Sequence, residues 1–183
     1  MNQIRLPMAK CATNSELLKE VWRTEGMELK EVTQTLRINW DTKSGTFLLN
    51  TRDVVGEYVD GPTTNRQVLQ LAVRFYEPLG LVAPVSVVGK LIFQDTWCRG
   101  LAWYELLPSD LGALWNTWVT AMPPLALLRV YKWLGTEDSS RFQVHVFCDA
   151  SERAYAAALY VRSCMVDRNV VSLACSKNRL APV

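Results

Sequence analysis

Hydrophobic positions repeat with a helical period in some parts of the chain and alternate with polar positions in others. Residues 14–24 carry apolar side chains at helical spacing, which predicts a helix that stops at Gly26. Residues 32–40 and 46–49 mostly alternate and are joined by a turn that contains a glycine, so they predict a β-hairpin. Residues 51–61 combine charges with glycines and predict a linker.

The middle of the chain predicts three amphipathic helices. The first begins at a capping-box pattern in residues 64–67 and is broken at Pro78. The second covers residues 84–99, and the third starts behind Pro108 and ends at Pro123. We expect their apolar faces to pack on one another or on neighbouring domains.

The last third of the chain changes from a helical period to an alternating one. Residues 127–133 predict a strand. Residues 142–150, 154–162 and 169–177 then predict a three-stranded antiparallel meander. Helices in the middle and antiparallel strands on both sides indicate an α+β fold, in which the meander would leave its sheet incomplete.

Composition excludes several classes of protein. Of the 183 residues, 49% are hydrophobic and 21% are charged, and the formal net charge is only +2. Disordered tails are less apolar, and histone-like nucleic-acid binders are far more basic. The N-terminus has no apolar segment of a signal peptide, and the longest apolar stretch, residues 78–88, contains two prolines and is too short to cross a bilayer. These features predict an intracellular protein, cytoplasmic or nuclear and not secreted, with no membrane contact.

Cysteine and histidine offer little catalytic or metal-binding chemistry. The five cysteines form no C-x-x-C pair and are odd in number, which argues against zinc sites and disulfides and predicts buried thiols. The single histidine, His145, lies within an alternating strand pattern and is expected to be half-buried and structural.

Asp149 is the strongest candidate for chemistry. It ends a strongly apolar strand in the segment FCDASERAY, where small neighbours leave room around its carboxylate. Magnesium prefers oxygen ligands of this kind, and paired metal ions hydrolyse phosphodiesters. An aspartate at such a position is, however, also a common cap or turn former.

Five segments, in the same order, resemble the pol polyprotein of BEL/Pao-type LTR retrotransposons. The most specific is PTTNRQVLQLAVRFYEPLGLVAPVSVVGKLIFQDTW (62–97), which resembles P-T-x-R-x-V-L, then F-D-P-L-G-L-x-x-P, then K-x-L-x-Q-x-x-W. VFCDASERAYAAALYVR (146–162) resembles F-x-D-A-S-x-x-A-Y-G-A-x-x-Y. The three other segments are MAKCATNSELL (8–18), TLRINWDTKSGTF (35–47) and GLAWYELLP (100–108).

The resemblance implies a division of the chain into three parts. Residues 1–60 would correspond to the end of the polymerase palm region, residues 61–125 to a helical thumb or connection, and residues 126–183 to a truncated ribonuclease H-like domain. Asp149 would be the first metal-binding carboxylate of that domain, and Mg²⁺ the cofactor of the parent enzyme, which performs reverse transcription and hydrolyses the RNA strand of RNA–DNA hybrids.

The same resemblance implies that the chain by itself is a catalytically inactive fragment. It has no adjacent Asp-Asp pair of the kind the polymerase needs, and the next ribonuclease carboxylate would lie beyond Val183. We therefore expect no tightly bound Mg²⁺, and expect the missing parts of the polyprotein to be its partners.

Two other functions stay open at this point. This retroelement region is also classed as a Pao-type peptidase, and Asp149-Ala150-Ser151 is an imperfect version of the D-T-G or D-S-G motif of aspartic peptidases. Alternatively, the helices serve only to bind a template–primer duplex or an RNA–DNA hybrid weakly, or to contact neighbouring parts of the polymerase. The phosphate contacts would then be Arg66, Arg74, Lys90 and Arg99.

Overall fold

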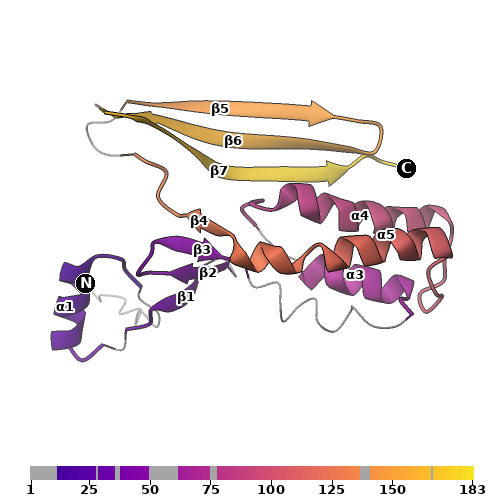
Figure 1. The fold of residues 1–183 in the computed structure, drawn as a ribbon, viewed down its shortest axis with the longest axis horizontal. Helices are drawn as coiled ribbons and strands as arrows, with labels where there is room; N and C mark the ends of the chain where they lie inside the picture. The colour runs from indigo at the N-terminus through magenta and orange to yellow at the C-terminus, as the bar shows by residue number, and fades with distance from the viewer. Residues whose placement is uncertain are drawn as a thin grey trace, which may run out of the picture.

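The computed structural model describes residues 12–27, 29–35, 38–49, 62–74, 78–136, 141–165 and 167–183. These residues form four α-helices and two separate antiparallel sheets, which confirms the predicted α+β fold (Figure 1). The linker predicted at 51–61 lies outside the described residues.

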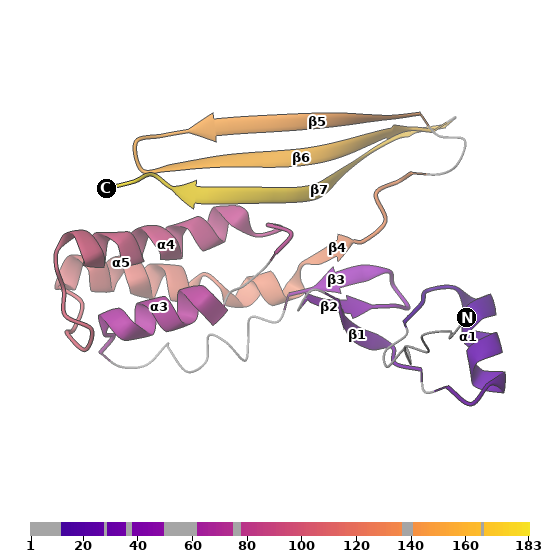
Figure 2. The same ribbon diagram turned by 180° about the vertical axis from the view of Figure 1, so that it is seen from behind.

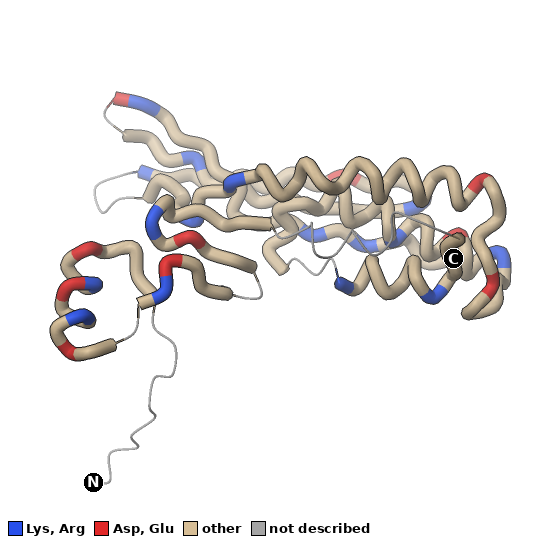
Figure 3. The backbone as a smooth tube through the Cα atoms, turned by 60° about the horizontal axis from the view of Figure 1, so that its bottom comes forward, with Lys and Arg blue, Asp and Glu red and all other residues tan. Residues whose placement is uncertain are grey.

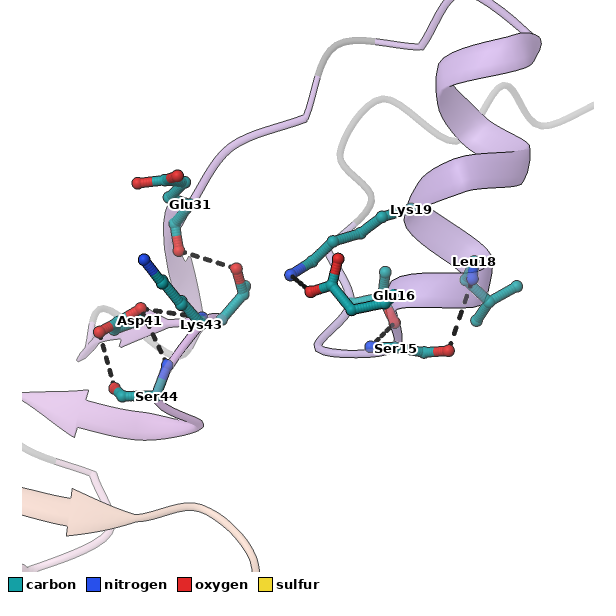
Figure 4. A network of polar contacts seen from close by, with 10 residues as sticks. Ser15, Glu16, Leu18, Lys19, Glu31, Asp41, Lys43 and Ser44 are labelled. Atoms are coloured by element: carbon teal, nitrogen blue, oxygen red, sulfur yellow. Dashed lines mark hydrogen bonds and ion pairs between the residues drawn. The ribbon is translucent and has the colours of Figure 1, made fainter.

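The first helix, α1 (Glu16–Thr24), confirms the helix predicted in residues 14–24. Ser15 caps it, because its hydroxyl accepts a 3.4 Å hydrogen bond from the backbone N–H of Leu18, and Glu16 pairs with Lys19 at 2.7 Å (Figure 4). None of its residues is fully buried, and Leu17 is 80% exposed, so α1 adds little to the core.

The first sheet contains the predicted hairpin and one distant strand, but the single strand predicted over residues 32–40 is instead two antiparallel strands. Its order is β1 (Val32–Thr35), β2 (Ile38–Asp41), β3 (Thr46–Leu48) and β4 (Arg129–Tyr131), all antiparallel. Asp41 organises the turn between β2 and β3: its carboxylate accepts hydrogen bonds from the backbone of Lys43 and the hydroxyl of Ser44, and these bonds hold its pKa below the usual range (Figure 4).

A small core lies on this first sheet. Its buried members are Ile38, Trp40 and Phe47, and Val130 of β4 packs against them. The strand predicted at 127–133 is therefore confirmed as β4, and its partner is β3 rather than a strand of the meander.

The helical unit comprises α3 (Asn65–Arg74), α4 (Ala83–Cys98), α5 (Ser109–Thr120) and the short 3₁₀ helix η1 (Pro123–Leu127). All three predicted helices are confirmed, and they surround the main core. Its buried members are Val68, Leu71, Ile92, Trp115, Trp118, Val119 and Met122.

The buried faces of α4 and α5 differ in detail from the predicted stripes. Val88 and Leu114 lie at the apolar spacing that predicts a buried position on each helix, yet they are 39% and 55% exposed. On α4 the buried face is instead formed by Ala83, Gly89, Ile92 and Thr96. Gly89 is buried because the ring of Trp118 lies against its Cα, where a side chain would not fit.

The second sheet confirms the predicted meander. It consists of β5 (Arg141–Ala150), β6 (Ala154–Cys164) and β7 (Asn169–Leu180), in that order and antiparallel. A bulge at Leu159/Tyr160 shifts the β6–β7 register. All ten residues of β5 are exposed, and no described strand pairs with its outer edge.

Helix α4 covers the outer edge of β7, the side of the sheet opposite to β5 (Figures 1 and 2). The backbone N–H of Ser176 donates to the carbonyl of Leu79 at 2.7 Å, and its hydroxyl donates to the carbonyl of Gly80. Asn178 joins β7 to the helix, since its side chain donates to the carbonyl of Ala83 at 2.7 Å and accepts from Lys90 at 2.6 Å.

We predict that amide exchange is slower in α3 and α4 than in β5. The helices enclose the main core, whereas β5 buries no side chain and its outer edge faces solvent. Hydrogen-exchange mass spectrometry of peptides from residues 65–74, 83–98 and 141–150 measures this difference. Equal protection of all three segments would contradict it.

Candidate active site at the end of the second sheet

Asp149 lies one residue before the end of β5, where the sheet opens to solvent. It pairs with Ala156 of β6, which pairs with Asn178 of β7, so these three side chains share one face of the sheet. The Asp149 carboxylate accepts a 2.9 Å hydrogen bond from the backbone N–H of Ala150. Because Ala156 is small, nothing on β6 shields the carboxylate on that face.

The hairpin beside Asp149 is fixed by local hydrogen bonds and by one ion pair. The Ser151 hydroxyl accepts from the backbone of Arg153 and of Ala154 at 3.3 and 3.2 Å, which closes the turn between β5 and β6. The Arg153 guanidinium reaches Asp95 of α4 at 2.6 Å. The turn that follows the candidate aspartate is thus connected to the helical unit.

Two hollows border Asp149, one on each face of the sheet. The first, of about 520 Å³, lies between the start of α4 and the sheet, and its mostly apolar lining includes Pro84, Val87, Phe147 and Tyr160. The second, of about 610 Å³, has a different character: Tyr155 lines it together with the cations Lys177 and Arg179.

The surroundings of Asp149 do not form a complete metal site. Among the residues that the structure describes, no three His, Cys, Asp or Glu side chains gather where they could hold an ion. Asp149 has the right chemistry for one Mg²⁺ ligand, but a magnesium ion also needs further oxygen ligands in octahedral geometry. The described part of the chain thus offers one ligand and not a site.

The four cations predicted to contact nucleic acid are not gathered around Asp149. The Arg99 guanidinium binds both oxygens of Asp110, at 3.0 and 2.6 Å, and this pairing lowers the pKa of the Asp110 carboxyl. Arg66 donates to the Tyr104 hydroxyl at 2.6 Å. Arg74 lies in the last turn of α3. Lys90 is the exception, because it donates a hydrogen bond to Asn178, which is paired through Ala156 with Asp149 across the sheet.

Sequence reasoning missed the cations that do lie near Asp149. Lys177 and Arg179 flank Asn178 on β7, which occupies the same row as Asp149. Their alternate spacing in a strand could have placed them on one face. Their nearness to Asp149 follows only from the pairing of β5, β6 and β7.

The predicted burial of the cysteines and of His145 is wrong in the described residues. Cys98, Cys148 and Cys175 are exposed and Cys164 is only partly buried, while Cys11 lies outside the described residues. His145 is exposed on β5. The physical reason is the same for Cys148 and His145: both lie on a strand whose two faces carry no covering layer in the structure.

The α+β fold and the exposed carboxylate at a strand end are compatible with a domain that acts on nucleic acid. Comparison with known protein families then assigns the chain to one of them. The chain belongs to the family of Pao retrotransposon-like RNaseH-like domains, which matches residues 64–183. The match covers both the helical unit and the second sheet, and it confirms the resemblance found in the sequence. An RNaseH-like domain implies a nucleic-acid substrate and typically uses Mg²⁺.

No curated protein matches the chain. Within the described residues, no helix combines the length and the apolar character that crossing a bilayer requires.

Proposed function

We propose that this chain is the region of a BEL/Pao-type polyprotein that leads from the end of the reverse transcriptase into the ribonuclease H-like domain. In this proposal Asp149 is one of the metal-binding carboxylates with which the parent protein hydrolyses the RNA strand of RNA–DNA hybrids. One observation carries it: within the matched region, Asp149 is an exposed carboxylate at the open end of a three-stranded antiparallel sheet.

Bound magnesium would supply an activated water and stabilise the leaving oxygen of the phosphodiester. The described residues contribute a single ligand to this chemistry, so other parts of the polyprotein would complete the site. What this chain does itself is to hold the carboxylate. The pairing of β5 with β6 and the ion pair of Arg153 with Asp95 keep the end of the sheet in place.

The parts of the chain have separate roles in the proposal. Residues 1–60 are the end of a palm-like region, residues 61–125 a thumb-like or connection-like segment, and residues 126–183 the beginning of the ribonuclease H-like domain. The compact core of α3, α4 and α5 supports an independent helical segment. The parent protein would act inside the cell, in the cytoplasm or nucleus, where its nucleic-acid substrates are found.

We predict that the purified chain hydrolyses no RNA–DNA hybrid in Mg²⁺, because one carboxylate cannot hold two catalytic ions. In the parent polyprotein, hydrolysis should depend on Mg²⁺ and fall at least about 100-fold in Asp149→Asn. Release of labelled fragments from the RNA strand of a hybrid measures both.

Asp167→Asn is the matched control for this experiment. Asp167 is an exposed carboxylate in the β6–β7 connection, at the opposite end of the same sheet, so its loss should leave hydrolysis unchanged. Equal activity of Asp149→Asn and the unmodified polyprotein would refute the role of Asp149. Robust hydrolysis by the isolated chain, lost in Asp149→Asn, would show that the chain already holds a complete site.

The two alternative functions have different support. In the part of the chain that the structure describes, the Ser151 hydroxyl closes a tight turn and gives no support to an aspartic peptidase. Proteolysis without Mg²⁺ that is lost in Asp149→Asn would favour that function. Non-catalytic binding of a template–primer duplex through Arg66, Arg74, Lys90 and Arg99 remains compatible with the helical unit. Lys90 of α4 and Arg99, the C-cap of that helix, are about two and a half helical turns apart, so they project from opposite sides of the helix and one bound strand would contact only one of them.

A further inference from the structure

We infer that Lys177 and Arg179 form a binding site for the phosphodiester backbone of a nucleic acid at the Asp149 end of the second sheet. The inference rests on the proposed nucleic-acid substrate and extends it to residues that neither the sequence pattern nor the family resemblance assigned. We call these two residues the β7 cation pair.

The first support is the placement of the two side chains. Lys177 and Arg179 are two residues apart on β7, so both project from the same face of the sheet, and both are exposed. Neither contacts a carboxylate among the residues that the structure describes. By contrast, Arg99 and Arg153, which also lie near α4, are each paired with an aspartate.

The second support is the surface around the pair. Opposite Arg179 on β6 is Tyr155, which is 45% exposed, and opposite Lys177 is the small residue Ala157. Because Ala157 carries only a methyl group beside the large ring of Tyr155, a hollow of about 610 Å³ remains, and both cations line it. An exposed tyrosine beside cations suits a nucleic-acid strand, because the ring can stack on a base while the cations contact phosphates.

The third support is repulsion between Lys177 and a neighbouring cation. The Lys90 ammonium, on α4, donates a hydrogen bond to the side-chain amide of Asn178, which is neutral. Asn178 is the residue between Lys177 and Arg179 in the sequence. Burial lowers the pKa of the Lys90 ammonium, and the positive charge of Lys177 lowers it further. A bound phosphate would relieve this repulsion, whereas an added cation would increase it.

The distance to Asp149 suits contacts with the same nucleic-acid strand. Asp149 and Asn178 lie in one row with Ala156 between them, so two interstrand spacings, about 10 Å, separate their backbones. Asp149 projects from the face opposite to the cation pair, but it borders the same hollow because the sheet ends one residue later. A strand that crosses this end can contact the cations and the carboxylate together. Elsewhere along the chain, positive and negative residues are interspersed (Figure 3). The overall charge of the protein therefore does not by itself create a phosphate-binding site.

The test is a salt titration of the binding of a labelled RNA–DNA hybrid to the full chain in EDTA, where nothing is hydrolysed. Each phosphate contact contributes about 0.9 to the slope of log affinity against log salt. We expect Lys177→Gln with Arg179→Gln to reduce the slope by about 1.8. Lys177→Arg with Arg179→Lys should retain it, because both charges remain.

Arg23→Gln with Lys30→Gln is the matched control, since it removes the same charge from exposed positions in the N-terminal region. An unchanged slope in the Lys177 and Arg179 variant, or an equal reduction in the control, would overturn the inference while leaving the proposed function untouched. The Lys177 and Arg179 variant should keep its binding to polyglutamate. If it lost polyglutamate binding as much as hybrid binding, the inference would also be overturned, because the pair would then attract any polyanion. Failure of the unmodified chain to bind the hybrid at low salt would count against the nucleic-acid substrate itself.

Discussion

Gly80→Ala should destabilise the protein by on the order of 3 kcal/mol and release β7 from α4. Gly80 has a φ of 70°, a conformation that costs a residue with a Cβ about 1–2 kcal/mol. A Cβ at this position would also lie within bonding distance of the backbone carbonyl of Ser176, which cannot move without breaking the β7 ladder. The two penalties therefore add, and the second acts directly on the junction between the helical unit and the sheet.

Chemical denaturation measures the loss of stability, and hydrogen exchange at Ser176 measures the release of β7. Gly100→Ala is the matched control, because Gly100 has a φ of 67° and no atom lies within 4 Å of the Cβ it would gain. It should show only the conformational penalty and leave exchange at Ser176 unchanged. Equal effects of the two substitutions would mean that the close approach of Gly80 to β7 is unimportant.

Gly89→Ala should destabilise the main core by about 1–3 kcal/mol, although alanine is the better helix former. The new Cβ would lie 2.4 Å from the ring of Trp118, well inside van der Waals contact. Trp118 cannot simply rotate away, because its indole N–H donates to the carbonyl of Val85 at 2.9 Å. The added methyl group must therefore push α4 and α5 apart or break that hydrogen bond.

Gly112→Ala tests the same substitution where space is open. Gly112 lies in α5, and the Cβ it would gain meets no atom within 4 Å. This variant should be stabilised by up to about 1 kcal/mol through helix propensity alone. Opposite signs for the two variants in urea denaturation are the expected result. A gain of stability in both would show that the helices separate at little cost.

The elements of this fold could be predicted from local patterns, but their partners could not. The apolar periods located the three helices of the helical unit and the three strands of the meander, because each period reflects the geometry of its own segment. Nothing local indicates that Val130 packs on the hairpin near Phe47. Nor does local alternation reveal what covers a face: Phe142 and Val146 share a face as their spacing requires, yet they are 60% and 59% exposed.

The candidate site, too, could be predicted from the sequence only in part. Asp149 could be singled out because an aspartate after an apolar strand is visible in the sequence. The β7 cation pair could not, because its relation to Asp149 depends on two register choices across β6 and on a bulge within it. The tie between Lys90 and Asn178 joins residues 88 positions apart, and it depends on α4 docking along β7.

The pairing of β4 with β3 has a consequence for the order of folding. Leu48 and Arg129 are neighbours in the first sheet, so the pairing closes a loop of about 80 residues, which is entropically costly for an unfolded chain. The helical unit lies inside this loop, and its own contacts are more local. Once α3, α4 and α5 have packed, they shorten the loop that remains to be closed. We therefore expect the helices to form before β4 joins its sheet, so the first sheet would be the last part of the chain to acquire its full set of strands.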